Sequence, residues 1–421
     1  MPLEKTRIIP RIAIIAVLCL VVLNVLLVAC GDSRTTITFV FLSSSPDKLR
    51  DYWNDVIKDF EAANPDVNVD LRVYKWNEGR PKIAEMVADG RPPDLARVAT
   101  REVPEYVAAG WVELVDDYFS PDFRQQFYPL FIDEGARYRG RTFGLPAAVS
   151  ARVMYYNKDL LAQAGYDAPP TTWDELREIA LAVSRPAEGI YGFGVPASEG
   201  FAETSTYFYY FLWGNGGEVF SPDGTKVAFD SPAGVEALAF LNDLVQGGAA
   251  PPNPLDYTRK DIGNDFVDGK LAMVITKLGG LDPTDFAYGV APIPYKTTPV
   301  LPLVEDTLIM FQTSEHKPET WRFIEFIYQD VYRLAYSELE GAVPEKVTVA
   351  QDPAVAQRYQ SFLEWLPDGK FEPLNIESAQ IADDVSVAVR QVFLGQKSPS
   401  EALTEAAVQA NERLSYSASA W

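Results

Sequence analysis

Side chains suited to binding a hydroxyl-rich ligand follow three expected strands near the start of the chain. Ser43 and Ser44 follow the first strand, Trp76 follows the second, and Arg97 and Arg101 lie at and just after the end of the third. Hydroxyls exchange hydrogen bonds, an indole ring packs against C–H faces, and a guanidinium fork binds vicinal hydroxyls or an anion. Ligands of an α/β sheet lie beyond the carboxyl ends of its strands, so we expect these residues at one site.

Simpler roles are open for the same residues. A serine after a strand also caps the following helix, and a tryptophan at a strand end also packs at the rim of the sheet. An arginine on a very acidic protein also forms surface ion pairs. The sequence does not choose between these roles and ligand binding.

Charged residues at two later positions extend the candidate site. Lys277 follows an apolar strand, and Glu305 with Asp306 interrupts an extended apolar segment. Carboxylates beside a cleft accept hydroxyl hydrogen bonds, and they also form ion pairs with guanidinium groups such as those of Arg97 and Arg101. We expect one of these two arrangements at Glu305 and Asp306.

Catalytic and metal chemistry have few candidate residues. The chain has one histidine, His316, and two cysteines, Cys19 and Cys30. Zinc sites and histidine-based triads need more, so we expect no metal and no cofactor. A secreted glycan hydrolase with two carboxylates is the enzymatic alternative. The adjacent pairs 116–117 and 383–384 make poor acid–base partners, because neighbouring side chains point in different directions.

Length and charge limit the architecture and the partners. A chain of 421 residues is too long for one small core and predicts two domains, or one domain with two lobes. The formal net charge of −22 repels nucleic acid and anionic lipid headgroups, so neither is an expected partner.

The N-terminus is typical of a secretory signal. Lys5, Arg7 and Arg11 precede an uncharged apolar run at 12–28. The letters LVAC at 27–30 resemble a bacterial lipobox, which predicts a signal peptide at 1–29, lipidation of Cys30, and a polar tether at 30–36. The alternative is an uncleaved membrane anchor. Both place the body of the protein outside the cytoplasmic membrane, in the periplasm or at the cell surface.

The hydrophobic pattern predicts an α/β protein throughout. Alternating strands and helical stripes between residues 37 and 98 give a β-α-β-α-β opening, with the second helix expected at 81–89. This order implies a parallel or mixed sheet with crossover helices. Three extended segments lack a helical period, at 145–151, 301–308 and 341–345. We expect the chain to cross between two lobes at these segments.

Motifs along the whole mature chain resemble one family in their order and spacing. They are FEAANPDV at 60–67, FGLP at 143–146, YNKDL at 156–160, PTTWDEL at 170–176, FVDGKLAM at 266–273 and GAVP at 341–344. Read together, they resemble the extracellular solute-binding proteins of sugar ABC transporters, the maltose-binding-protein-like group.

The resemblance implies a type II periplasmic-binding-protein fold, with two α/β lobes, a hinge of several crossings and a ligand cleft between the lobes. It implies an N-terminal lobe of 37–146 plus 307–342 and a C-terminal lobe of 149–304 plus 345–421. It also implies a monomer without catalytic activity that delivers a carbohydrate to the transmembrane permease of an ABC importer.

The resemblance also assigns ligand contacts in the second lobe. The family places contacts near the start of a helix within the aromatic segment 199–213, which selects Thr206 and Tyr207, and Trp213 further along. The loop after Lys277 lacks the stacking tryptophans of maltose-binding protein, which disfavours a long maltodextrin. A sugar phosphate, an acidic sugar or a polyamine is the alternative ligand, because arginines, lysines and carboxylates are all present.

Overall fold

The computed structural model describes residues 34–199, 203–281 and 284–419. The predicted signal peptide at 1–29 and the predicted lipidation site, Cys30, lie outside these residues. Among the helices of the described part, none combines the length and the apolar character that a membrane span requires.

The first third of the chain alternates strands and helices, as the sequence predicts. The elements are β1 (Thr35–Ser43), α2 (Pro46–Ala63), β2 (Val67–Lys75), α3 (Trp76–Ala88), β3 (Leu95–Ala99) and α4 (Val103–Ala108). The helix expected at 81–89 begins earlier, at Trp76. Pro81 lies inside this helix rather than at its first turn.

The middle of the chain contains a long strand, several helices, three further strands of the same sheet and a separate two-stranded sheet, β4 with β5. The elements are α5 (Pro121–Arg124), the π-helical η2 (Phe131–Gly135), β4 (Arg137–Tyr138), β5 (Arg141–Thr142), β6 (Leu145–Asn157), α6 (Lys158–Gln163), α7 (Trp173–Val183), β7 (Tyr191–Phe193), α8 (Glu203–Gly214), α9 (Pro232–Gln246), α10 (Arg259–Val267), β8 (Leu271–Lys277) and β9 (Tyr288–Ala291).

The last third adds β10 and the short β11 to the sheet and is otherwise mainly helical. The elements are β10 (Leu301–Met310), α11 (Lys317–Ile327), α12 (Asp330–Glu340), α13 (Val347–Ala350), α14 (Pro353–Arg358), α15 (Gln360–Trp365), β11 (Gly369–Phe371), α16 (Ser378–Phe393) and α17 (Pro399–Ser419).

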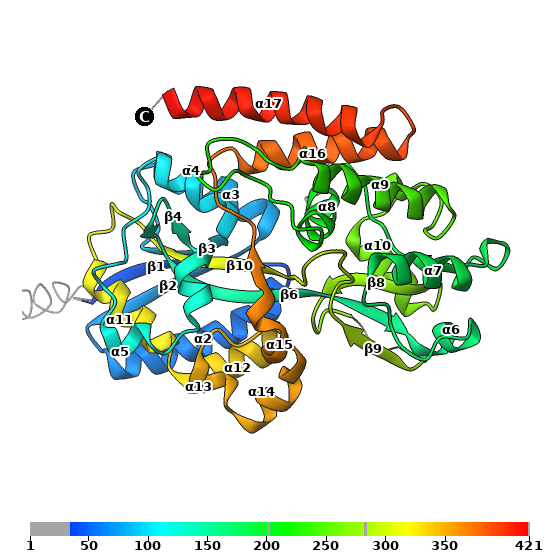
Figure 1. Cartoon of the computed structure of the whole chain (residues 1–421). Helices are drawn as coiled ribbons and strands as arrows, with labels where there is room; N and C mark the ends of the chain where they lie inside the picture. The colour runs from blue at the N-terminus through cyan, green and yellow to red at the C-terminus, as the bar shows by residue number, and fades with distance from the viewer. Residues whose placement is uncertain (1–33, 200–202, 282–283, 420–421) are drawn as a thin grey trace, which may run out of the picture.

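One mixed sheet runs through the molecule in the order β2-β1-β3-β10-β6-β8-β7, with β11 beside β10 and β9 beside β6. The start of β6 pairs with β10, and its end pairs with β8 and β9. Strand β6 therefore passes from one half of the molecule to the other (Figure 1). We call these halves the β1 half, which holds β1, β2 and β3, and the β8 half, which holds β7, β8 and β9.

Each half has its own hydrophobic core. Helices α2 and α11 and strand β1 contribute to one core in the β1 half, and α8, α9 and α16 contribute to the core of the β8 half. Two of the three segments that we expected to cross between the lobes, 145–151 and 301–308, lie in β6 and β10. The third segment, 341–345, contacts β6, because Val343 N–H donates to the Val149 carbonyl at 2.9 Å. The residue limits of the two lobes stay a prediction.

A buried ion pair ties the third crossing to the β1 half. Arg333 on α12 is 3% exposed, and its Nε donates to Glu345, which is 2% exposed, at 2.5 Å. The same guanidinium donates to the Ala147 carbonyl in β6 at 2.9 Å. Because a buried charge is costly unless it is paired, this arrangement holds α12, the 341–345 segment and β6 in one geometry.

Candidate ligand-binding site

The carboxyl ends of β1, β2 and β3 meet around a buried arginine. Arg97 is 2% exposed, and it donates to Asp306 at 2.6 Å and to Glu340 at 3.0 Å. Its guanidinium lies over the rings of Phe41 and Trp76, at 4.8 and 5.3 Å from their centroids. The structure thus contains the ion pair that the sequence left open between Asp306 and Arg97.

Trp76 begins α3 and is partly buried. The helix packs closely on β1 at Gly79, where an added Cβ would lie 1.9 Å from Leu42 Cδ2. A larger residue at 79 would push α3 away from the strand. Gly79 therefore helps to place the Trp76 ring beside Arg97, with part of its surface open to solvent.

The two serines after β1 have different surroundings. Ser43 is buried, and its hydroxyl accepts the backbone N–H of Ser45 at 2.9 Å. Ser43 therefore shapes the turn into α2. Ser44 is exposed at the carboxyl end of the strand, where its hydroxyl can meet a ligand. Ligand contact by either serine stays a prediction.

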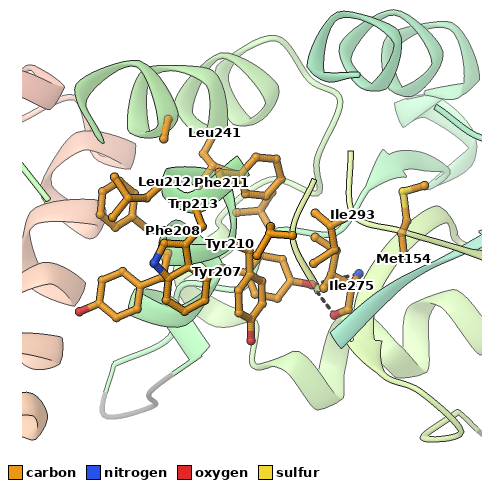
Figure 2. Close-up of a cluster of buried hydrophobic side chains, with 14 of the residues drawn as sticks. Met154, Tyr207, Phe208, Tyr210, Phe211, Leu212, Trp213, Leu241, Ile275 and Ile293 are labelled. Atoms are coloured by element: carbon orange, nitrogen blue, oxygen red, sulfur yellow. Dashed lines mark hydrogen bonds between the residues drawn. The ribbon is translucent and has the colours of Figure 1, made fainter. Parts of the chain in front are cut away.

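The residues expected on α8 lie mostly inside the protein. Tyr207 is 2% exposed, and its hydroxyl donates to the Ile275 carbonyl at 2.6 Å and accepts Ile275 N–H at 3.2 Å (Figure 2). Trp213 is 3% exposed within the same aromatic cluster. The partly buried Thr206 bonds back to the Glu203 carbonyl at 3.3 Å. The hydroxyl of Tyr207 thus has no hydrogen left for a ligand.

Two cations face each other across the β6–β8 ladder. Arg152 and Lys277 are register partners in these antiparallel strands, so their side chains lie on the same face. Lys277 Nζ donates to the Glu340 carbonyl at 3.0 Å, which joins the β8 half to α12. Sequence reasoning found Lys277 but missed Arg152, whose signal is a lone arginine in an otherwise apolar strand.

A small cavity of about 90 Å³ lies between β10 and the segment after β11, and three carboxylates line it. Arg101 is exposed at its edge, and Thr100 Oγ1 donates to the Glu305 carbonyl at 2.5 Å. Burial raises the pKa of Glu372 to about 7, opposed by the charge of Arg101. Burial, and then the charge of Asp306, raises the pKa of Glu305.

A second cavity, of about 520 Å³, opens beside α10 in the β8 half. Lys277, Thr276 and Gly280 line one side, and Glu203 and Arg259 also line it. Arg259 and Glu203 form an ion pair of 3.2 Å. The site residues that the sequence reasoning missed are therefore Arg152, Glu203, Arg259, Glu340 and Glu372.

The sequence profile of the family described as bacterial extracellular solute-binding protein matches residues 46–333. The chain belongs to this family. A binding protein of Brucella abortus (strain 2308) is 33% identical over 394 residues, which cover 90% of this chain and 93% of that protein. The maltotriose-binding protein of Pyrococcus abyssi is 24% identical, over 77% of this chain and 69% of its own length.

A solved structure of this kind of protein confirms the fold. An ABC transporter solute-binding protein of Thermotoga lettingae, bound with α-D-tagatose, superposes with a TM-score of 0.78. It is 28% identical and matches over 90% of this chain and 100% of its own. This solute-binding protein thus has the predicted type II periplasmic-binding-protein fold, with two α/β lobes, and the family places it in the bacterial extracellular class.

Proposed function

We propose that this solute-binding protein is the capture component of an ABC importer for a carbohydrate. It binds the sugar in the cleft between its lobes and delivers it to the permease without chemical change. The observation that carries the proposal is the convergence of Trp76, Asp306, Glu340 and Lys277 from both halves at the β6–β10 crossing. A partly exposed indole ring and several charged hydrogen-bonding groups are what a polyhydroxylated ligand requires.

The proposal includes the location of the protein. The basic residues, apolar run and lipobox at the N-terminus support export and a lipid anchor on Cys30, on the periplasmic or outer side of the cytoplasmic membrane. Fractionation of cells that express the full chain tests this part. The wild type should stay with membranes, and Cys30→Ala should not.

A thermal-shift screen tests the ligand class. The mature protein, residues 33–421, is heated with neutral monosaccharides and oligosaccharides, sugar acids and sugar phosphates, and melting is followed by tryptophan fluorescence. A ligand at one hundred times its Kd stabilises the folded state by about 2.7 kcal/mol, which a melting curve resolves. A saturable shift without product formation supports the proposal. Release of a hydrolysed product would favour the hydrolase alternative, and no shift with any sugar or sugar derivative would reject carbohydrate capture.

A further inference from the structure

Arg152 is a buried guanidinium that has no carboxylate within ion-pair distance in the described part of the chain. The residue is 7% exposed, Nη1 donates to the Ser150 hydroxyl at 3.0 Å, and the buried Nε has no hydrogen-bond partner. Within the described part of the chain, no carboxylate forms a salt bridge with it. Its second close polar neighbour is the hydroxyl of Tyr210 on α8. A charge this deep ordinarily has an anionic partner.

Lys277, on the neighbouring strand, is a second largely buried cation without a carboxylate contact among the described residues. It stands in register with Arg152, and its ammonium group donates to a backbone carbonyl of Glu340 rather than to a carboxylate. Burial lowers the pKa of Lys277, and the nearby Glu340 charge opposes this shift. Burial lowers the pKa of Arg152 and the charge of Arg259 adds to this shift, whereas the Tyr210 hydroxyl and the charge of Glu203 oppose it. Two cations without a direct carboxylate contact among the described residues therefore share one face of the β6–β8 ladder.

The other arginines of the site differ in this respect. Arg97 contacts the carboxylates of Asp306 and Glu340, and Arg259 contacts that of Glu203. Among the described residues of the site, Arg152 and Lys277 are thus the cations that lack a direct carboxylate contact, within a protein whose formal net charge is −22. Such a pair, next to otherwise neutralised charges, favours an anion from outside the protein.

The face is next to a cavity that a small solute can enter. The cavity of about 520 Å³ beside α10 is lined by Lys277, by Arg259 and by the hydroxyl residues Thr258 and Thr276. This volume is within the range of small-molecule sites. Hydroxyl side chains around cations suit a solute that carries both hydroxyls and an acid group.

We infer that the solute carries an anionic group, a carboxylate or a phosphate, which binds to Arg152 and Lys277. The ligand is then an acidic or phosphorylated sugar or polyol rather than a neutral one. This inference rests on the proposed function, because it assigns the chemical class of the solute that the cleft captures.

Matched pairs of probes test the inference by calorimetric titration. D-glucuronate is compared with D-glucose, and glycerol 3-phosphate with glycerol, on the mature wild-type protein. In at least one pair the acidic member should bind at least tenfold more tightly than its neutral partner. Equal or tighter binding of the neutral members would overturn the inference and leave carbohydrate capture intact. Binding of neutral oligosaccharides, with none of the four probes bound, would likewise overturn the inference and leave carbohydrate capture intact. No binding of any sugar or acid would overturn both.

Variants then locate the anionic group. Arg152→Gln and Lys277→Gln should each lower the affinity for the acidic probe at least tenfold, whereas Arg152→Lys keeps the charge and should retain the preference for the acid. Lys296→Gln is the control, because it removes an equal charge from the exposed surface, where Lys296 pairs with Glu236. Circular dichroism checks that Arg152→Gln is folded. An unchanged preference in folded Arg152→Gln and Lys277→Gln would overturn the assignment.

Discussion

Single residues at the strand ends combine structural and binding roles. Arg97 is held by hydrogen bonds to Asp306 and Glu340. Its guanidinium packs against one face of the Trp76 ring. The ring is thus held in one orientation before any ligand arrives. Such preorganisation lowers the entropic cost of binding.

Trp76→Ala should therefore weaken solute binding with little loss of stability. The variant removes the partly exposed ring, so the ligand loses its apolar contact, and affinity should fall about tenfold, or about 1.4 kcal/mol. Titration of the ligand identified in the thermal screen measures the change. Trp76→Phe is the matched control and should keep most of the affinity. An unchanged Kd for Trp76→Ala would remove the residue from the site.

Glu372 gives the protein a pH dependence of known sign. Its pKa is about 7 in the folded state, against about 4.3 in an unfolded chain. Between these values the folded protein holds a proton that the unfolded chain has released, so the free energy of unfolding falls as pH rises from about 4 to 7. In Glu372→Gln the loss of stability between about pH 4 and 7 should be smaller by about 1–2 kcal/mol. The effect is limited to this size because the Glu372 side chain keeps some exposure to solvent.

Urea unfolding at pH 5, 6 and 7 measures the effect. The groups that line the cavity with Glu372 are Arg101, Glu305 and Asp306, and the variant leaves them in place. Glu364→Gln, on the exposed face of α15, is the control. Parallel pH profiles for wild type and Glu372→Gln would show that Glu372 titrates at its ordinary pKa.

Helix α8 illustrates what a sequence pattern leaves undecided at the scale of one element. Its residues from Tyr207 to Trp213 are all buried, so no polar face marks the side that meets the ligand (Figure 2). The order of β1, α2, β2 and β3 was predictable, because their apolar residues follow clear periods. The early start of α3 was missed, since Pro81 was read as the start of a helix and lies inside it.

Tyr207→Phe tests the role of α8 as a packed element. The hydroxyl joins α8 to the backbone of β8 at Ile275, and its loss should lower the free energy of unfolding by about 1–3 kcal/mol. Ligand affinity should stay the same. Tyr166→Phe is the control, because its hydroxyl bonds the exposed Glu178, and it should cost less than about 0.5 kcal/mol. Weaker ligand binding with an unchanged free energy of unfolding would show that Tyr207 contacts the ligand.

The buried ion pair between Arg333 on α12 and Glu345 makes a second prediction at this scale. Arg333→Met leaves the Glu345 carboxylate buried and unpaired, which should destabilise the protein by about 3–5 kcal/mol in urea unfolding. Arg333→Met combined with Glu345→Gln removes both charges and should recover a large part of this loss. If the double variant is no more stable than the single one, the packing of Arg333 on Tyr328 and Tyr336 is the main contribution.

The whole molecule explains why the site was only partly predictable. The alternation of strands and helices in the first third of the chain followed from local periods, and the two lobes followed from the family motifs. The charge network did not, because it joins residues far apart in sequence, such as Arg97 with Glu340 and Arg152 with Lys277. Only the folded sheet shows that Arg97 has direct carboxylate contacts, whereas Arg152 and Lys277 have none among the described residues. Local patterns contain no information on that difference.

The same arrangement predicts a closing motion about the crossings. The two halves are joined by β6, β10 and the 341–345 segment, and a ligand that contacts both halves favours the arrangement in which they approach. Beyond Cys30 the chain has no cysteine, so the mature protein without Cys30 accepts spin labels only where a cysteine is introduced. Arg91→Cys near α3 and Asp174→Cys on α7 place labels at exposed positions in opposite halves.

Electron spin resonance should show a shorter distance between these two labels when the ligand saturates the protein. Arg91→Cys with Arg322→Cys is the control, since Arg322 is exposed on α11 in the same half as Arg91, and its distance should not change. The Lys277–Glu340 contact lies at the crossing, so it acts as part of the pivot and should persist in both states. Equal distances with and without ligand for the Arg91–Asp174 pair would mean that the solute enters a cleft that is already closed.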